Sequence, residues 1–144
     1  MGNTDTIHLL KECDAGTKMA ISSIDEVIEK VEDSAMRSLL QESKNHHKAL
    51  EKEISSQLSK YDAEGKEPNP IAKGMSWMKT NMKLGMDNSD KTVANLITDG
   101  CNMGVKSLNQ YYNQYKCADS SAKDICKRLA LIEEQLGKEL QKFL

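Results

Sequence analysis

The chain has 144 residues, with 20 Lys and Arg against 22 Asp and Glu and a formal net charge of −2. This length fits a single domain, residues 1–144, with one hydrophobic core. The charge balance gives no electrostatic case for nucleic-acid binding, and no apolar run is long enough for a transmembrane segment. The four cysteines form no Cys-x-x-Cys pair, and the N-terminus does not have the pattern of an export signal. We therefore expect a cytoplasmic protein with free, buried thiols.

Four long segments carry apolar residues spaced three and four apart, which is typical of amphipathic helices. Short turns near Glu32 and Ala118 force the helices on either side to be antiparallel neighbours. Side chains that can accept hydrogen bonds from a first helical turn precede the later segments, at Asp33-Ser34, Asn88-Ser89-Asp90 and Asp119-Ser120. The predicted helices cover residues 5–31, 34–61, 89–116 and 120–144, and they form the hairpins 5–61 and 89–144.

A long crossover, residues 62–88, joins the two hairpins. Its first part, 64–70, contains the two prolines of the chain and a glycine, and this composition predicts a loop. The following stretch, 71–86, is rich in methionine and carries apolar residues at helical spacing, which predicts a short helix. We favour a helix that covers one flank of the bundle. The alternatives are a membrane-surface helix and a surface that binds a partner helix.

The two hairpins repeat each other. The pattern Cys-x-x-Gly-x-Lys occurs at 13–18 and again at 101–106, and Leu-x-Lys-Glu occurs at 50–53 and again at 136–139. A repeat of this length predicts a duplicated two-helix unit. A glycine in the middle of a helix lowers stability by about 1 kcal/mol relative to alanine. Its presence in both copies suggests that helices approach each other closely there, with cysteine as a small packing neighbour.

Five segments of the chain, 10–16, 31–33, 39–42, 74–79 and 99–101, carry a further pattern. Together they resemble a bacterial family of uncharacterised ferritin-like four-helix-bundle proteins. The resemblance implies an all-α fold, a ferritin-like antiparallel four-helix bundle built from two repeated hairpins with a long crossover. The resemblance covers nearly the whole chain.

Ferritin-like di-iron enzymes direct a Glu from each of two helices, and Glu-x-x-His from each of the other two, into the bundle. Here His46 and His47 fall on the predicted core stripe, but the residues three positions before them are Ser43 and Lys44. The repeat places the aliphatic Ile132 at the position of His46. The inward positions of the first and third helices are near Thr17 and Val105. We therefore expect no intact di-iron site and no enzyme.

A smaller metal site is the alternative. Glu42 and His46 are one helical turn apart, with His47 beside them, and Cys13 or Asp14 of the first helix could face them. Imidazole, carboxylate and thiolate together suit one transition-metal ion such as zinc or iron. We favour histidines that are partly exposed, or buried with one hydrogen bond, and therefore no cofactor.

The other charged residues have a simpler interpretation. Most glutamates are expected on solvated helix faces with lysine partners one turn away, namely Glu26, Glu29, Glu42, Glu51, Glu53, Glu133, Glu134 and Glu139. No glycine-rich phosphate loop and no nucleophile–base pair is recognisable, so no catalytic residue is assigned. The leading hypothesis is a non-catalytic bundle that forms a homo-oligomer or binds a protein partner.

Overall fold

The computed structural model describes residues 2–66 and 89–144. In these residues the chain forms four α-helices, two short 3-10 turns and no strand. The helices are α1 (Gly2–Val27), α2 (Ser34–Ser59), α4 (Asp90–Gln114) and α5 (Ser120–Leu140), and the 3-10 turns are η1 (Ile28–Lys30) and η2 (Gln141–Phe143). None of the described helices is long and apolar enough to cross a membrane. The predicted helix of the crossover lies outside the described residues.

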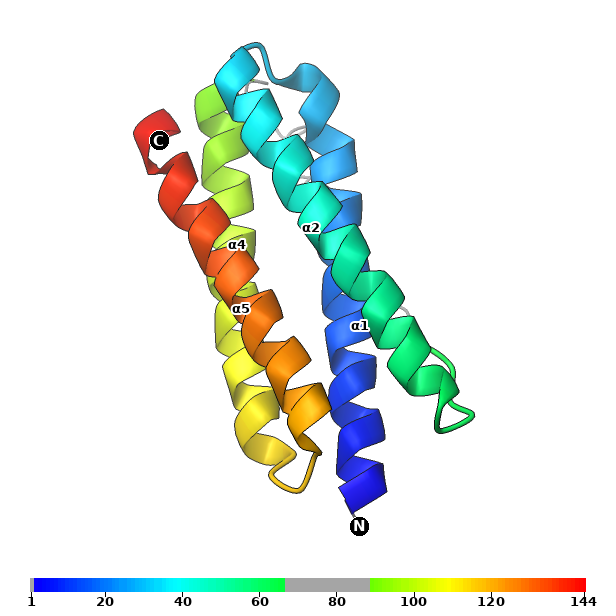
Figure 1. The fold of residues 1–144 in the computed structure, drawn as a ribbon. Coiled ribbons are helices and arrows are strands. Elements are labelled where there is room, and N and C mark those ends of the chain that lie inside the picture. Colours follow the sequence, from blue (N-terminus) through cyan, green and yellow to red (C-terminus); the bar gives the residue numbers. More distant parts are fainter. Residues whose placement is uncertain (1, 67–88) are drawn as a thin grey trace.

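The four helices form a bundle of two antiparallel hairpins, α1–α2 and α4–α5 (Figure 1). The α1–α2 turn lies at the end of the bundle where α4 begins, and the α4–α5 turn lies at the end where α1 begins. This placement makes α1 and α5 run parallel, and the two helices contact each other. The prediction of two helical hairpins is confirmed.

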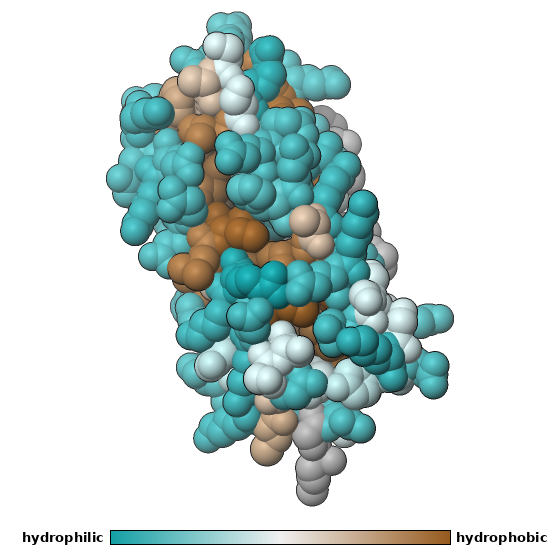
Figure 2. Space-filling view, viewed as in Figure 1, coloured by the Kyte–Doolittle hydropathy of each residue, from teal (hydrophilic) through white to brown (hydrophobic). Residues whose placement is uncertain are grey.

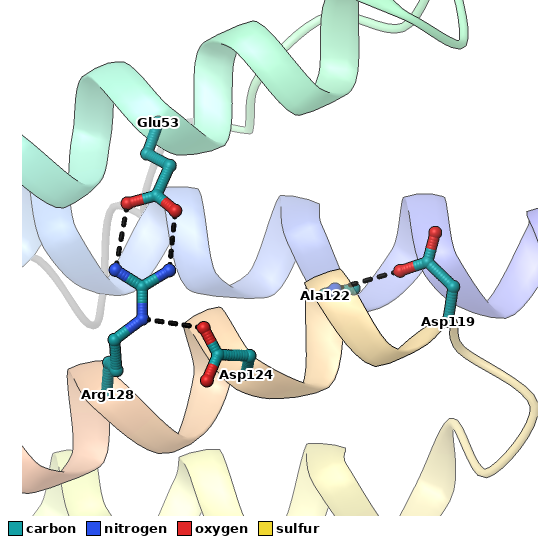
Figure 3. Close-up of polar contacts among 5 residues, drawn as sticks. All are labelled: Glu53, Asp119, Ala122, Asp124 and Arg128. Carbon is teal, nitrogen blue, oxygen red and sulfur yellow. Dashed lines mark hydrogen bonds and ion pairs between the residues drawn. The ribbon is translucent and has the colours of Figure 1, made fainter.

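Three helices begin at the residues that their capping signals predict. The side chains of Asp33, Ser89 and Asp119 each accept a hydrogen bond from the backbone N–H three residues later. Figure 3 shows this contact for Asp119 and Ala122. Such caps satisfy N–H groups that have no partner within the helix, which fixes where each helix starts. In contrast, α1 begins three residues before the predicted Asp5.

Each hairpin turn is bound by the first helical turn of the other hairpin. The Asp90 carboxylate, at the start of α4, accepts hydrogen bonds from the backbone N–H groups of Glu32 and Asp33, both at 2.9 Å. The second turn is bound to α1 in the same way, by Cys117 N to Asp5 Oδ2 at 2.8 Å and Asp119 N to Thr6 Oγ1 at 2.8 Å. The two hairpins therefore hold each other at both ends of the bundle.

Replacing Asp90 with alanine should lower the free energy of unfolding by about 1–2 kcal/mol, because two backbone N–H groups of the α1–α2 turn lose a charged acceptor. Urea denaturation followed by circular dichroism measures the change. Asp99→Ala, at an exposed position of the same helix, is the control and should change stability by less than about 0.5 kcal/mol. Equal effects of the two substitutions would show that the Asp90 contacts do not hold the turn.

One charged contact joins α2 to α5 across the surface (Figure 3). The Arg128 guanidinium donates to both oxygens of Glu53, at 2.9 and 2.5 Å, and to Asp124 at 2.8 Å. The arginine lowers the pKa of Glu53. Sequence analysis placed Glu53 on a solvated face with a lysine one turn away, and its partner is instead an arginine of another helix. An exposed pair of this kind contributes about 1 kcal/mol or less.

The core consists of two apolar clusters, one toward each end of the bundle. The cluster near the α1–α2 turn contains Ile24, Val27, Val31, Met36, Leu40, Val93, Ala94, Leu96, Ile97, Cys101, Leu136 and Leu140. The cluster near the α4–α5 turn contains Leu9, Leu10, Cys13, Leu50, Ile54, Leu58, Leu108, Ala118, Ala122, Ile125, Cys126 and Leu129. These positions follow the predicted helical periodicity closely. The two clusters leave a gap in the middle of every helix.

Candidate functional site

The gap between the apolar clusters is filled by residues that are polar or lack a side chain. We call this set the central polar layer: Thr17 of α1, Ser43 and His47 of α2, Gly104 of α4 and Glu133 of α5. Thr17, Ser43, His47 and Glu133 are all buried. Buried polar groups lower stability unless they find partners. The layer is therefore the part of the core where polar residues stand in place of the apolar residues that would give higher stability.

The ring of His47 is held in one orientation by its own helix. The side chain is completely buried, and Nδ1 lies 2.7 Å from the carbonyl oxygen of Ser43, one turn earlier. A carbonyl oxygen only accepts hydrogen bonds, so Nδ1 carries a proton and donates it. Nε2 is therefore the ring nitrogen that remains available to another group, and it lies 3.9 Å from Oε1 of Glu133. A similar arrangement fixes the tautomer of many histidines with a functional Nε2.

Glu133 is a carboxylate in an almost closed environment, with 7% of its surface exposed. Burial raises the pKa of Glu133, and the nearby imidazole of His47 acts in the opposite direction. Within the described part of the chain, two buried atoms of the pair have no hydrogen-bond partner: Nε2 of His47 and Oε2 of Glu133. The two side chains therefore depend mainly on each other, and a proton or a cation between them would satisfy both.

Gly104 provides the space for this carboxylate. A Cβ atom at position 104 would lie 2.8 Å from Cδ and 2.9 Å from Oε1 of Glu133, which is closer than van der Waals contact. Its counterpart in the repeat, Gly16, would place a Cβ atom 3.7 Å from Leu129, an ordinary contact. Close helix approach was the predicted role of both glycines. At Gly104 the neighbour is a buried carboxylate of α5.

The raised pKa of Glu133 predicts that stability falls as the solution becomes less acidic. The folded protein holds the carboxyl proton more tightly than the unfolded chain does, so this contribution is complete below the ordinary pKa of 4.5 and is lost as pH rises through the folded value. Glu133→Gln, which mimics the protonated acid, should flatten the decline. Urea denaturation at several pH values measures it, with the exposed Glu134→Gln as control. The same slope in both variants would contradict the assignment.

The structure separates the residues that sequence analysis proposed as metal ligands. His47 is buried in the central polar layer, whereas its neighbour His46 is exposed, as is Glu42. The prediction that both histidines lie on the core stripe is wrong for His46, because adjacent helical residues point about 100° apart. Cys13 lies in the apolar cluster near the α4–α5 turn, and Asp14 faces Lys18 at 2.8 Å and the backbone N–H of Lys66 at 2.9 Å.

The partner of His47 is a residue that sequence analysis placed elsewhere. Glu133 was expected on a solvated face, and it is buried because α5 turns it toward α2 and α4. The repeat could have indicated that Glu133 is buried, because the offset that relates Leu50 to Leu136 also relates His47 to Glu133. The two residues thus occupy equivalent positions of the two hairpins and meet in the middle of the bundle. The expectation of buried thiols also fails at one position, Cys117, which is exposed next to a turn.

Neither a family model nor a curated protein sequence matches the chain. One solved structure does: the bacterioferritin-related protein from Bacteroides fragilis, described as a dodecameric thioferritin, matches with a TM-score of 0.72. The match covers 97% of this chain and 84% of that chain. The sequence identity is 13%. The fold is ferritin-like. This confirms the fold that the resemblance implied, and at such low identity the likeness concerns the fold alone.

The residues of this ferritin-like bundle do not fit a di-iron group. Such a group needs glutamates from all four helices and two histidines, whereas the central polar layer supplies His47 and Glu133. Across residues 2–66 and 89–144, no three His, Cys, Asp or Glu side chains are grouped so that they could hold a metal ion. The assignment of a metal to Glu42, His46, His47, Cys13 and Asp14 stays a prediction.

Proposed function

We propose that this protein is a non-catalytic ferritin-like bundle that works as an assembly of identical subunits. The central polar layer carries the proposal. Where a di-iron enzyme of this fold needs six ligating side chains, the layer has one imidazole and one carboxylate, 3.9 Å apart, with Gly104 against the carboxylate. Such a pair can share a proton, but it does not provide the ligands that two iron ions require.

Self-association is supported by the surface and by the structural neighbour. Large apolar side chains are exposed at Met103 of α4 and Leu131 of α5, where 57% and 62% of the surface is accessible. Figure 2 shows hydrophobic atoms at the surface between rows of hydrophilic side chains on the face that it displays. The neighbour of the same fold is described as dodecameric. Contact between subunits would cover side chains of this kind.

Two measurements test the proposal. Light scattering after size-exclusion chromatography should give one discrete oligomer, which Leu131→Glu weakens and Gln135→Glu, the same charge at a nearby exposed position of α5, leaves intact. A monomer at every concentration would contradict self-association. Ferrous iron should be oxidised no faster with the protein than in buffer. Saturable oxidation that is lost in Glu133→Ala would contradict the non-catalytic role.

A second candidate function is the binding of one metal ion by His47 and Glu133. The two buried atoms without described partners, Nε2 of His47 and Oε2 of Glu133, favour it. Imidazole nitrogen and carboxylate oxygen are suitable ligands for zinc or iron, and the Ser43 carbonyl already orients the imidazole. The pair replaces the combination of Glu42 and His46 that sequence analysis considered.

Metal content distinguishes the two functions. Protein loaded with zinc, iron or manganese and then desalted should carry no stoichiometric metal by mass spectrometry if the first proposal holds. One bound equivalent that is lost in His47→Ala and kept in His46→Ala would establish the second function, because only the buried histidine faces Glu133. Equal loss in both variants would point to surface binding.

A further inference from the structure

The chain reverses its direction directly after α2. Asp62 has a φ of 53°, in the left-handed region, and its N–H donates to the carbonyl oxygen of Ser59 at 3.1 Å. The N–H of Ala63 donates to the carbonyl oxygen of Leu58 at 3.0 Å. These two bonds form a Schellman motif, which ends many helices. The loop that follows, residues 63–66, turns back along the bundle (Figure 1), and we call it the strap.

The strap is bound to α1 by a buried carboxylate. The side chain of Asp14 is 1% exposed, and its Oδ2 accepts a hydrogen bond from the backbone N–H of Lys66 at 2.9 Å. The same oxygen lies 2.8 Å from Nζ of Lys18, one turn further along α1. The Lys66 ammonium forms a second contact with α1, an ion pair with Glu12. Backbone and side chain of one strap residue are therefore both held by acidic residues of α1.

Gly65 lets the strap lie directly on this carboxylate. A Cβ atom at position 65 would overlap Oδ2 of Asp14 and would lie 3.1 Å from its Cγ and 3.2 Å from Nζ of Lys18. At the other end of the strap, Ala63 packs against the apolar cluster near the α4–α5 turn. The strap is thus held at both ends, by an apolar contact at Ala63 and by polar contacts at Lys66.

The repeat shows that the strap, and not the bundle, buries Asp14. The offset of 88 that relates Cys13 to Cys101 also relates Asp14 to Asn102. Asn102 is exposed on α4, whereas Asp14 is buried on α1. The equivalent position of a helical hairpin therefore faces solvent where no strap lies on it.

We propose that residues 63–66 open and close as a unit on the folded bundle, and that Asp14 holds the closed state. This inference goes beyond the proposed function and does not depend on it. The strap is held by the few contacts described above, and segments with few buried contacts open at a lower free energy than the whole fold. Opening uncovers the carboxylates of Asp14 and Glu12. The closed strap, with its Lys66, therefore covers an acidic surface of α1 that the open state presents.

Hydrogen exchange of the full-length protein, followed by NMR in water and in low urea, tests the motion. The amides of Ala63 and Lys66 should be protected relative to a free peptide, but at least about tenfold less than those of the buried Leu10 and Leu129. Their exchange should not respond to low urea, because opening of the strap exposes little surface. Protection equal to that of Leu10 and Leu129, with the same urea dependence, would overturn the proposal. No protection of Lys66 would overturn it as well.

Asp14→Asn tests the role of the carboxylate, because it removes the charged acceptor with little change of shape. The protection of Lys66 and Ala63 should fall together, by about tenfold, the effect of losing a hydrogen bond to a charged group. Asp99→Asn makes the same chemical change at an exposed position of α4 and should leave both amides unchanged. A loss of protection at Lys66 alone would show that a single bond opens, and not the strap.

Gly65→Ala tests the same contact from the side of the strap and leaves α1 intact, so it decides the question even if Asp14→Asn does not fold. We expect Ala63 and Lys66 to lose protection, while Leu10 and Leu129 keep theirs. Combined with Asp14→Asn it should cause no further loss, because both substitutions disrupt one contact. Full protection of Lys66 in Gly65→Ala would overturn the proposal.

Discussion

Replacing His47 with leucine should lower the free energy of unfolding by about 3 kcal/mol at neutral pH, the largest effect that we expect from any polar residue of the bundle. The substitution leaves the buried Glu133 without the group that moderates its pKa, so the carboxylate either stays charged without a partner or takes up a proton. Urea denaturation measures the loss, and His46→Leu, at the exposed neighbouring position, should change stability by less than about 0.5 kcal/mol.

A double substitution tests the cause of that loss. Leucine at both His47 and Glu133 removes the unpaired carboxylate, and exchanges of buried ion pairs for apolar residues are often neutral or stabilising by about 1–4 kcal/mol. The double variant should therefore be at least as stable as the unsubstituted protein. If the losses of the two single variants simply added, the residues would not act as a pair. A stable double variant would also show that the layer is kept for a purpose other than stability.

The second large effect concerns a single methyl group. Gly104→Ala should lower the free energy of unfolding by about 1–3 kcal/mol, because its Cβ atom overlaps the Glu133 carboxylate, which is enclosed in the core. Gly100→Ala, one turn earlier on α4, meets nothing within 4 Å. It should raise stability by about 0.4–1 kcal/mol, as alanine usually does in a helix. The two substitutions are chemically identical and opposite in sign, and thermal unfolding distinguishes them.

A rescue experiment assigns the Gly104 effect to the carboxylate. In a Glu133→Ala background the overlapping atoms are gone, so Gly104→Ala should lose its destabilising effect relative to that background. An unchanged penalty there would mean that α4 itself has to move. Tolerance of alanine at position 104 in the unsubstituted protein would show that the Glu133 side chain can relocate within the core.

Helical periodicity and capping chemistry were sufficient to predict most of the fold, because both depend on residues close in sequence. The apolar spacing located the helices, and Asp33, Ser89 and Asp119 marked where three of them begin. The start of α1 was misplaced because Gly2, Asn3 and Thr4 carry no helical signal. The repeat indicated two equivalent hairpins, and the bundle of Figure 1 has that arrangement.

The candidate site was harder to predict because it depends on how the hairpins face each other. Glu133 is followed directly by Glu134 on α5, and the exposed Glu134 has the lysine partner one turn away that a solvated face predicts. Only the repeat offset points from His47 to Glu133.

The reciprocal contacts at the turns have a consequence for the order of folding. Asp90 and Glu32 are 58 positions apart, and Asp5 and Cys117 are 112 positions apart, so these bonds form only after both hairpins exist and dock. Contacts of such long range form late, and weakening them accelerates unfolding more than it slows folding. We therefore expect these bonds to affect mainly the unfolding rate, and so the lifetime of the folded bundle, and to have little effect on the folding rate.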